Sequence, residues 1–159
     1  MVQKAKTVRE EIRQTRPFGS TSAEAILTLY RTSDAVQRDF AKLIEPEGIS
    51  AQQYNVLRIL RGAGSEGLPT LDIADRMVER TPGITRLLDK LEAKELVRRR
   101  RCPEDRRQVL CYITEPGMRL LAKLDRPLSE AGVRCMSALT DQQMRELIEL
   151  LNQVRAALS

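Results

Sequence analysis

The order of periodic segments between residues 70 and 114 constrains the fold of this chain more than any other feature. Apolar residues first recur at helical spacing, and from Val97 the period changes to that of short strands. A tight polar turn at Glu79-Arg80 separates two short helical stretches, and the polar turn CPEDRR separates the strand-like runs VRRRR and QVLCYIT. The sequence therefore predicts two packed helices followed directly by a β-hairpin.

The second helix of this pair has two chemically different faces. Thr81 is a good N-cap residue, and Pro82 suits the first helical position, where its missing N–H would have no partner. The apolar positions that we expect to face inward are Ile84, Leu87, Leu88 and Leu91. The outward positions are then Pro82, Gly83, Thr85, Arg86, Asp89 and Lys90.

This outward face is suited to the major groove of double-stranded DNA. Small residues at the tip allow a close approach, Thr85 can reach base edges or phosphate, and Arg86 can pair bidentately with guanine. The helix N-terminus adds a partial positive charge and free N–H groups for phosphate. We therefore predict DNA contacts from six residues: Thr81, Pro82, Gly83, Thr85, Arg86 and Lys90.

The hairpin is the most basic part of the chain. Residues 94–107 hold seven basic and three acidic residues, and so carry four of the five net positive charges. Only every second arginine of a strand can face the DNA. We predict that Arg99 and Arg101 are the strand arginines that contact DNA. Charged edge strands also deter aggregation, so the run alone is ambiguous. Its place beside a helix-turn-helix favours DNA contact.

The remaining segments predict a mainly α protein in one compact domain. Residues 1–19 are expected to form a loose arm or a short helix. A capping box at Thr21 and Glu24 begins a long helix, and similar boxes start helices at Ser50 and Thr140. A further helix starts near Pro116, and we expect Pro127 to kink or break it. We assign 49–114 to DNA binding, and 20–48 and 115–159 to dimerisation, because their apolar stripes exceed what one small domain can bury.

Composition argues against enzymes and metal proteins. The chain has no histidine, and its three cysteines show no C-x-x-C spacing, so we expect no metal, no cofactor and no disulfide framework. With no glycine-rich phosphate loop, an enzyme is the least supported class. No apolar run approaches a membrane span or secretory signal, so we expect no membrane partner and a cytoplasmic protein. Cys111 and Cys135 lie on apolar stripes and are expected in the core.

The stretch from LDIADRM through TPGITRLLDKLEAKELVRRRRCPEDRRQVLCYITEPG resembles the MarR family of winged helix-turn-helix regulators. The hallmark of that family is a wing that carries D-R-R and ends in L-T, which here reads Asp105-Arg106-Arg107 and Ile113-Thr114. The resemblance implies that Thr85 and Arg86 contact the major groove and that Arg106 and Arg107 contact the minor groove or phosphates. Asp105 would brace the wing by pairing with an arginine. The chain departs from the family at Glu95, where glycine is common, so that turn is expected to differ.

The resemblance further implies a homodimeric transcriptional regulator, usually a repressor, bound to a pseudo-palindromic operator and released by a small aromatic or phenolic effector. One alternative is a non-sensing, architectural DNA-binding protein of the same fold. Another is a redox-responsive regulator acting through Cys102, because the four arginines before it favour the thiolate. A tolerated loop thiol is the simpler interpretation of Cys102.

Overall fold

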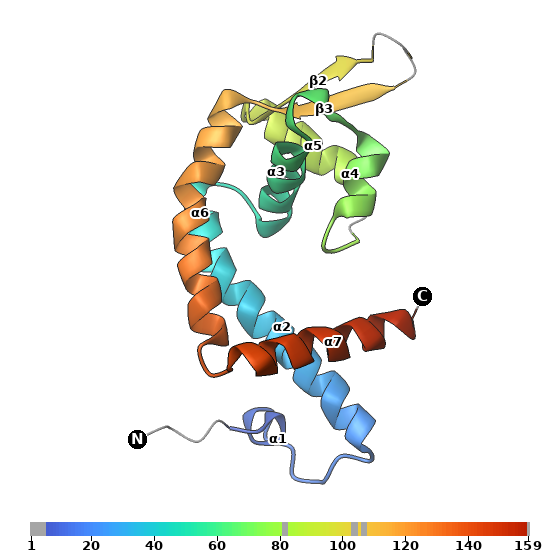
Figure 1. Cartoon of the computed structure of the whole chain (residues 1–159), viewed down its shortest axis with the longest axis vertical. Helices are drawn as coiled ribbons and strands as arrows, with labels where there is room; N and C mark the ends of the chain where they lie inside the picture. Colours follow the sequence, from blue (N-terminus) through green and yellow to red (C-terminus); the bar gives the residue numbers. More distant parts are fainter. Residues whose placement is uncertain (1–5, 81–82, 103–104, 106–107, 159) are drawn as a thin grey trace. The chain divides into compact units, whose positions relative to one another are not determined.

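A computed structural model describes residues 6–80, 83–102, 105 and 108–158 (Figure 1). The chain groups into two compact units, Met1–Phe40 and Ala41–Ser159, which are described separately below. Within the described residues, the α-helices and strands are, in order, α1 (Val8–Glu11), α2 (Thr21–Ile44), α3 (Ala51–Ala63), β1 (Leu68–Pro69), α4 (Thr70–Arg76), α5 (Ile84–Ala93), β2 (Val97–Arg101), β3 (Val109–Ile113), α6 (Glu115–Met136) and α7 (Asp141–Ala156). The predicted class, mainly α with a small β wing, is confirmed.

In the first unit, the short helix α1 is followed by a loop that leads into α2. Arg9 closes this loop, because its guanidinium donates hydrogen bonds to the carbonyls of Gln14 and Thr15 at 3.2 and 2.8 Å. The hydroxyl of Ser20 accepts from the N–H of Ala23 at 3.2 Å, so Ser20 caps α2 and Thr21 is its first helical residue. The predicted capping box at Thr21 is therefore wrong by one residue.

The core of the second unit is built around α3. The predicted capping box is confirmed, since Ser50 and Gln53 exchange hydrogen bonds of 3.0 and 3.2 Å between side chain and backbone. One face of α3 is fully buried against the neighbouring helices. The buried apolar side chains that meet there are Val56, Leu57 and Leu60 of α3, Ile73 of α4, Leu88 and Leu91 of α5, and Leu121 of α6.

The predicted hairpin is confirmed and gains a third strand. The sheet is antiparallel with the order β1-β3-β2, and Val97 pairs with Ile113 while Arg101 pairs with Val109. Strand β1 was not expected, because two residues are too short to show a period. It pairs Leu68 with Cys111. In Figure 1 the long hairpin projects beyond the helices that cover its base.

Helix α6 runs without a break past Pro127, so the predicted break is wrong. Leu124 and Leu128 are buried on either side of the proline, and this packing holds the helix together where one backbone hydrogen bond is lost. Arg61 of α3 also clamps α6 through a bidentate pair with Asp125 at 2.8 and 2.9 Å.

Helix α7 is amphipathic and starts at the predicted capping box of Thr140 and Gln143. None of its residues, all of which the structure describes, is buried. Its exposed apolar side chains, together with one just beyond its end, are Leu147, Ile148, Leu150, Val154 and Leu158. Across the described ranges, no helix combines the length and apolar character needed to cross a membrane.

Candidate nucleic-acid interface

Helix α5 begins at Gly83, which has a backbone conformation that other residues rarely adopt. Gly83 is the N-cap, with φ of 102°, and its carbonyl accepts from the N–H groups of Arg86 and Leu87 at 2.9 and 3.3 Å. A side chain there would meet no neighbouring atom, so the left-handed φ and not crowding explains the glycine. Thr81 and Pro82, the predicted N-cap and first helical residue, lie outside the described residues. Because Gly83 is the N-cap, α5 starts two residues later than predicted.

The two faces of α5 divide as the periodicity predicts. Leu88 and Leu91 are fully buried, and Ile84 and Leu87 are half-buried. The exposed positions are Gly83, Thr85, Arg86, Asp89 and Lys90. Of the residues predicted to contact DNA, the structure therefore presents Gly83, Thr85, Arg86 and Lys90 to solvent, and their contact with DNA stays a prediction.

Helix α4 and the turn after it hold α5 in place. Ile73 on α4 and Met77 just after it are buried, whereas Leu71 is 75% exposed. Residue 71 precedes Ile73 by two positions, or about 200° around a helix, so it points away from the buried face. The N–H of Val78 donates to the side-chain oxygen of Asn55 at 2.9 Å, which fixes the start of the turn to α3.

The end of α5 has the backbone of a glycine-terminated helix although its sequence has Glu95. Glu95 has φ of 58°, its N–H donates to the carbonyl of Glu92 at 2.9 Å, and the N–H of Leu96 donates to the carbonyl of Leu91 at 3.0 Å. These are the two bonds of a Schellman motif. The expectation that this turn differs is therefore wrong for the backbone, because Glu95 adopts the left-handed conformation itself.

Thr114 joins this end of α5 to the start of α6. Its hydroxyl donates to the carbonyl of Glu95 at 2.6 Å and accepts from the N–H of Gly117 at 3.2 Å, while its own N–H donates to Leu96 at 3.1 Å. Thr114, at the end of the wing, thus caps α6 and also anchors the turn that ends α5, the predicted DNA-reading helix.

The arginines of β2 point to two different faces. Arg98 stacks over the ring of Tyr112, with its guanidinium carbon 5.4 Å from the ring centroid. Arg99 and Arg101 lie on the opposite face with Val97, and Arg101 is exposed at the outer end.

Arg99 turns back onto α5. Its guanidinium pairs with Asp89 at 2.5 Å and with Glu92 at 2.6 Å. The hydrogen bonds from Arg99 lower the pKa of Glu92, and those to Glu92 and Asp89 raise the pKa of Arg99. Sequence reasoning missed this cluster and treated Arg99 as a DNA contact. The available signal was the pair of carboxylates three positions apart on a helix that precedes a basic strand.

Known proteins share this arrangement of helix, wing and flanking helices. The model of the MarR family matches residues 49–109. The transcriptional regulator TtmR of Methylorubrum extorquens is 31% identical over 137 residues, which are 86% of this chain and 68% of TtmR. The crystal structure of a MarR transcription factor from Planctomyces limnophilus is 40% identical, with a TM-score of 0.66 over 86% of this chain and 99% of that one. This chain belongs to the MarR family. It is a DNA-binding transcriptional regulator and not an enzyme.

The tip of this MarR-family wing is only partly described. Arg106 and Arg107 lie outside the described residues. The carbonyl of Asp105 accepts from the N–H of Gln108 at 2.9 Å, and the carbonyl of Gln108 accepts from the N–H of Cys102 at the same distance. The pairing of the Asp105 carboxylate with an arginine stays a prediction.

Two of the cysteines of this MarR-family chain lie in or next to the wing. Cys111 is fully buried as expected, and burial raises the pKa of its thiol. Cys102, which follows β2, is buried, with 8% of its surface exposed. Cys135 is only half-buried on α6.

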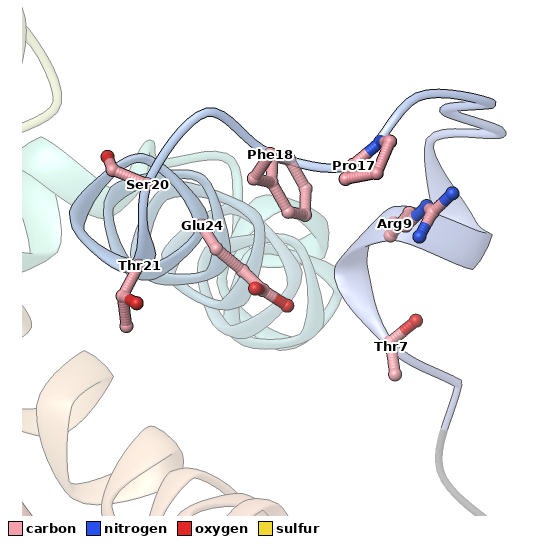
Figure 2. Close-up of a pocket in the computed structure, with 7 residues that line it drawn as sticks. All are labelled: Thr7, Arg9, Pro17, Phe18, Ser20, Thr21 and Glu24. Carbon is pink, nitrogen blue, oxygen red and sulfur yellow. The ribbon is translucent and has the colours of Figure 1, made fainter.

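A pocket of about 520 Å³ lies in the first unit, between α1 and the start of α2 (Figure 2). Figure 2 shows Phe18, Arg9 and Glu24 among the side chains around it. The guanidinium of Arg9 is held by the loop carbonyls of Gln14 and Thr15 described above. Among the residues that the structure describes, none of those predicted to contact DNA lines this pocket.

Proposed function

We propose that this regulator is a ligand-responsive repressor that binds a pseudo-palindromic operator as a homodimer. The observation that carries the proposal is the exposed set Thr85, Arg86 and Lys90 on a helix anchored through Leu88 and Leu91, directly beside a basic hairpin. A helix of this kind fits the major groove, and a hairpin tip reaches the minor groove and the phosphates. The structure of MepR of Staphylococcus aureus bound to DNA shares the fold, with a TM-score of 0.75 at 24% identity.

The proposed contacts divide between sequence and backbone. Gly83, Thr85, Arg86 and Lys90 of the reading helix, with Thr81 and Pro82 before them, meet base edges and adjacent phosphates. Arg101, Arg106 and Arg107 of the wing meet phosphates and the electronegative minor groove.

A homodimer is supported by the apolar surface that the outer helices leave exposed. Along α7, Ile148 and Leu150 are 57% and 58% exposed. On α2, Ile26 and Tyr30 are 52% and 68% exposed. Exposed apolar stripes on helices of a soluble protein mark an interface. Two copies related by a two-fold axis would present two reading helices to half-sites about one helical turn apart.

An aromatic or phenolic effector is supported by two named relatives. CouR of Rhodococcus jostii, solved with p-coumaroyl-CoA bound, is 27% identical, with a TM-score of 0.72 over 86% of this chain and 95% of CouR. The homoprotocatechuate degradative operon repressor of Escherichia coli is 25% identical over 127 residues, which are 80% of this chain and 84% of that protein. We propose that a ligand of this chemical class changes the separation of the two reading helices and so releases the operator.

Selection of bound duplexes from a random pool by the purified protein tests the DNA-binding part of the proposal. We expect a pseudo-palindromic consensus whose half-sites are centred about 10 base pairs apart. An asymmetric single site, or no consensus after repeated rounds, would contradict the two-fold arrangement and favour an architectural role.

The effector part needs a separate titration on the selected duplex. We expect p-coumarate, p-coumaroyl-CoA or a related phenolic acid to weaken binding. Buffer without any of these compounds and buffer with glucose serve as controls. Binding that none of these compounds changes would favour a non-sensing protein. Loss of binding with peroxide, abolished in Cys102→Ser, would instead favour the redox alternative.

A further inference from the structure

Two carboxylates on the reading helix need an explanation if that helix lies against DNA. Asp89 is exposed on the same outward face as Arg86, and Glu92 follows one turn later with 39% of its side chain exposed. Near the phosphate backbone, carboxylates repel the polyanion and oppose association. A neutralising partner within the protein removes this repulsion.

Arg99 supplies that partner with three of its nitrogen atoms. Its Nη2 atom lies 2.5 Å from Asp89 and 2.6 Å from Glu92, and its Nε atom donates to Glu92 at 2.9 Å. Its backbone N–H also donates to Glu92, at 3.1 Å. Strand β2 is at the edge of the sheet, so this N–H would otherwise be an open site for strand pairing. Glu92 thus accepts the hydrogen bond of this edge N–H, while the guanidinium of Arg99 neutralises the carboxylates of both Asp89 and Glu92.

We infer that Arg99 is a positioning residue that fixes the wing against the reading helix and neutralises Asp89 and Glu92, and that it does not contact DNA. The inference rests on the proposed placement of α5 in the major groove. The Arg99 side chain is 25% exposed, the least among the three partners. A planar guanidinium can serve two carboxylates in a fixed geometry, which a lysine ammonium cannot reproduce.

The neighbouring arginine offers a matched control within the same strand. Arg98 carries the same charge, but it lies on the opposite face, over the ring of Tyr112. Replacing either residue by glutamine removes one positive charge from β2. Only the replacement of Arg99 exposes two unpaired carboxylates beside the proposed DNA contacts.

The test compares Arg99→Gln, Arg98→Gln and the triple variant Arg99→Gln/Asp89→Asn/Glu92→Gln on a labelled duplex carrying the selected site, across salt concentrations. We expect Arg99→Gln to weaken binding by about tenfold or more, because like charges are left facing one another across the interface. The triple variant should return close to the affinity of the natural protein, because the uncovered carboxylates are gone. Its logarithmic salt slope should match that of the natural protein, because no phosphate contact is lost.

A slope that falls by about one in both Arg99→Gln and the triple variant would show that Arg99 contacts a phosphate, which overturns the inference. Equal effects of Arg99→Gln and Arg98→Gln would overturn it as well. If Arg99→Gln does not fold, Arg99→Lys keeps the positive charge but lacks the planar guanidinium. It should bind DNA with an affinity between those expected for Arg99→Gln and the natural protein, and its logarithmic salt slope should be unchanged. Arg86→Ala, measured in parallel, reports on α5 itself: no effect there would contradict the proposed function whatever Arg99 does.

Discussion

Glu95 has a backbone conformation that usually belongs to glycine, with φ of 58° at the end of the reading helix. Left-handed φ angles cost a residue with a side chain about 1 kcal/mol or more. We expect Glu95→Gly to raise the free energy of unfolding by about 1 kcal/mol, and so the melting temperature by roughly 2–4 °C. Thermal unfolding followed by circular dichroism measures this. Glu149→Gly makes the same exchange within the right-handed helix α7 and should destabilise the protein. The explanation would be contradicted if both variants were more stable than the natural protein, or if neither was.

Asp125 should make the stability of the protein depend on acid pH. The hydrogen bonds from Arg61 lower the pKa of Asp125 below its ordinary value of 3.8, so its stabilisation is present above that value and is lost as the pH falls through the folded-state pKa. Because the pair is partly exposed, we expect Asp125→Asn to cost only about 0.2–1 kcal/mol at neutral pH. The cost should shrink below about pH 4. Arg61→Gln should remove the same pH dependence in chemical unfolding, and a cost that is constant from pH 7 to pH 3 would rule this out.

The contact between the start of α6 and the end of α5 is tight at Gly117. A side-chain carbon at this position would lie 2.5 Å from the backbone carbonyl of Leu96, which cannot move without disturbing the Schellman turn. We expect Gly117→Ala to destabilise by about 1–3 kcal/mol, as overpacked cores do. Gly62→Ala in α3, where no atom lies within 4 Å, should be neutral or stabilising in the same urea titration. Equal costs for the two changes would show that α6 does not approach Leu96 so closely.

Elements with local signals could be predicted from the sequence. The capping boxes at Ser50 and Thr140 start their helices where expected, and the alternation of Val109, Cys111 and Ile113 correctly predicts a strand, in which Cys111 is buried and Val109 is exposed. Features that tertiary contacts decide could not be predicted. Strand β1 exists only because β3 offers it an edge, and α6 continues through Pro127 because the core holds both of its halves.

The candidate site also combines features that local sequence signals predict with features that tertiary contacts decide. The exposed face of α5 is predictable because its periodicity is local and strong. The engagement of Arg99 depends on the distance between a helix and a neighbouring edge strand, which one-dimensional alternation does not contain. Alternation correctly separates Arg98 from Arg99, but it cannot tell a face that meets DNA from one that meets α5.

For the whole molecule, the proposed dimer predicts a specific sensitivity of α7. We expect Ile148→Asp, which places a charge on the exposed apolar stripe, to shift sedimentation at micromolar concentration from dimer towards monomer and to weaken operator binding. Gln153→Asp introduces the same charge at an exposed polar position on α7 and should leave the dimer intact. A natural protein that sediments as a stable, folded monomer would refute the dimer, as would full operator affinity after deletion of residues 140–159.

In the proposed complex, α5 reads the DNA sequence while the wing holds the DNA backbone. Binding titrations across salt concentrations, on the selected duplex and on a scrambled one, distinguish these two roles. We expect Arg86→Ala to cost roughly 1–3 kcal/mol on the selected duplex and to relax its sequence preference, whereas Arg107→Ala weakens both duplexes similarly and reduces the salt slope by about one. Arg126→Ala, on the exposed surface of α6, should change neither. The claim is contradicted if Arg86→Ala weakens the two duplexes equally while Arg107→Ala leaves binding to the scrambled duplex unchanged.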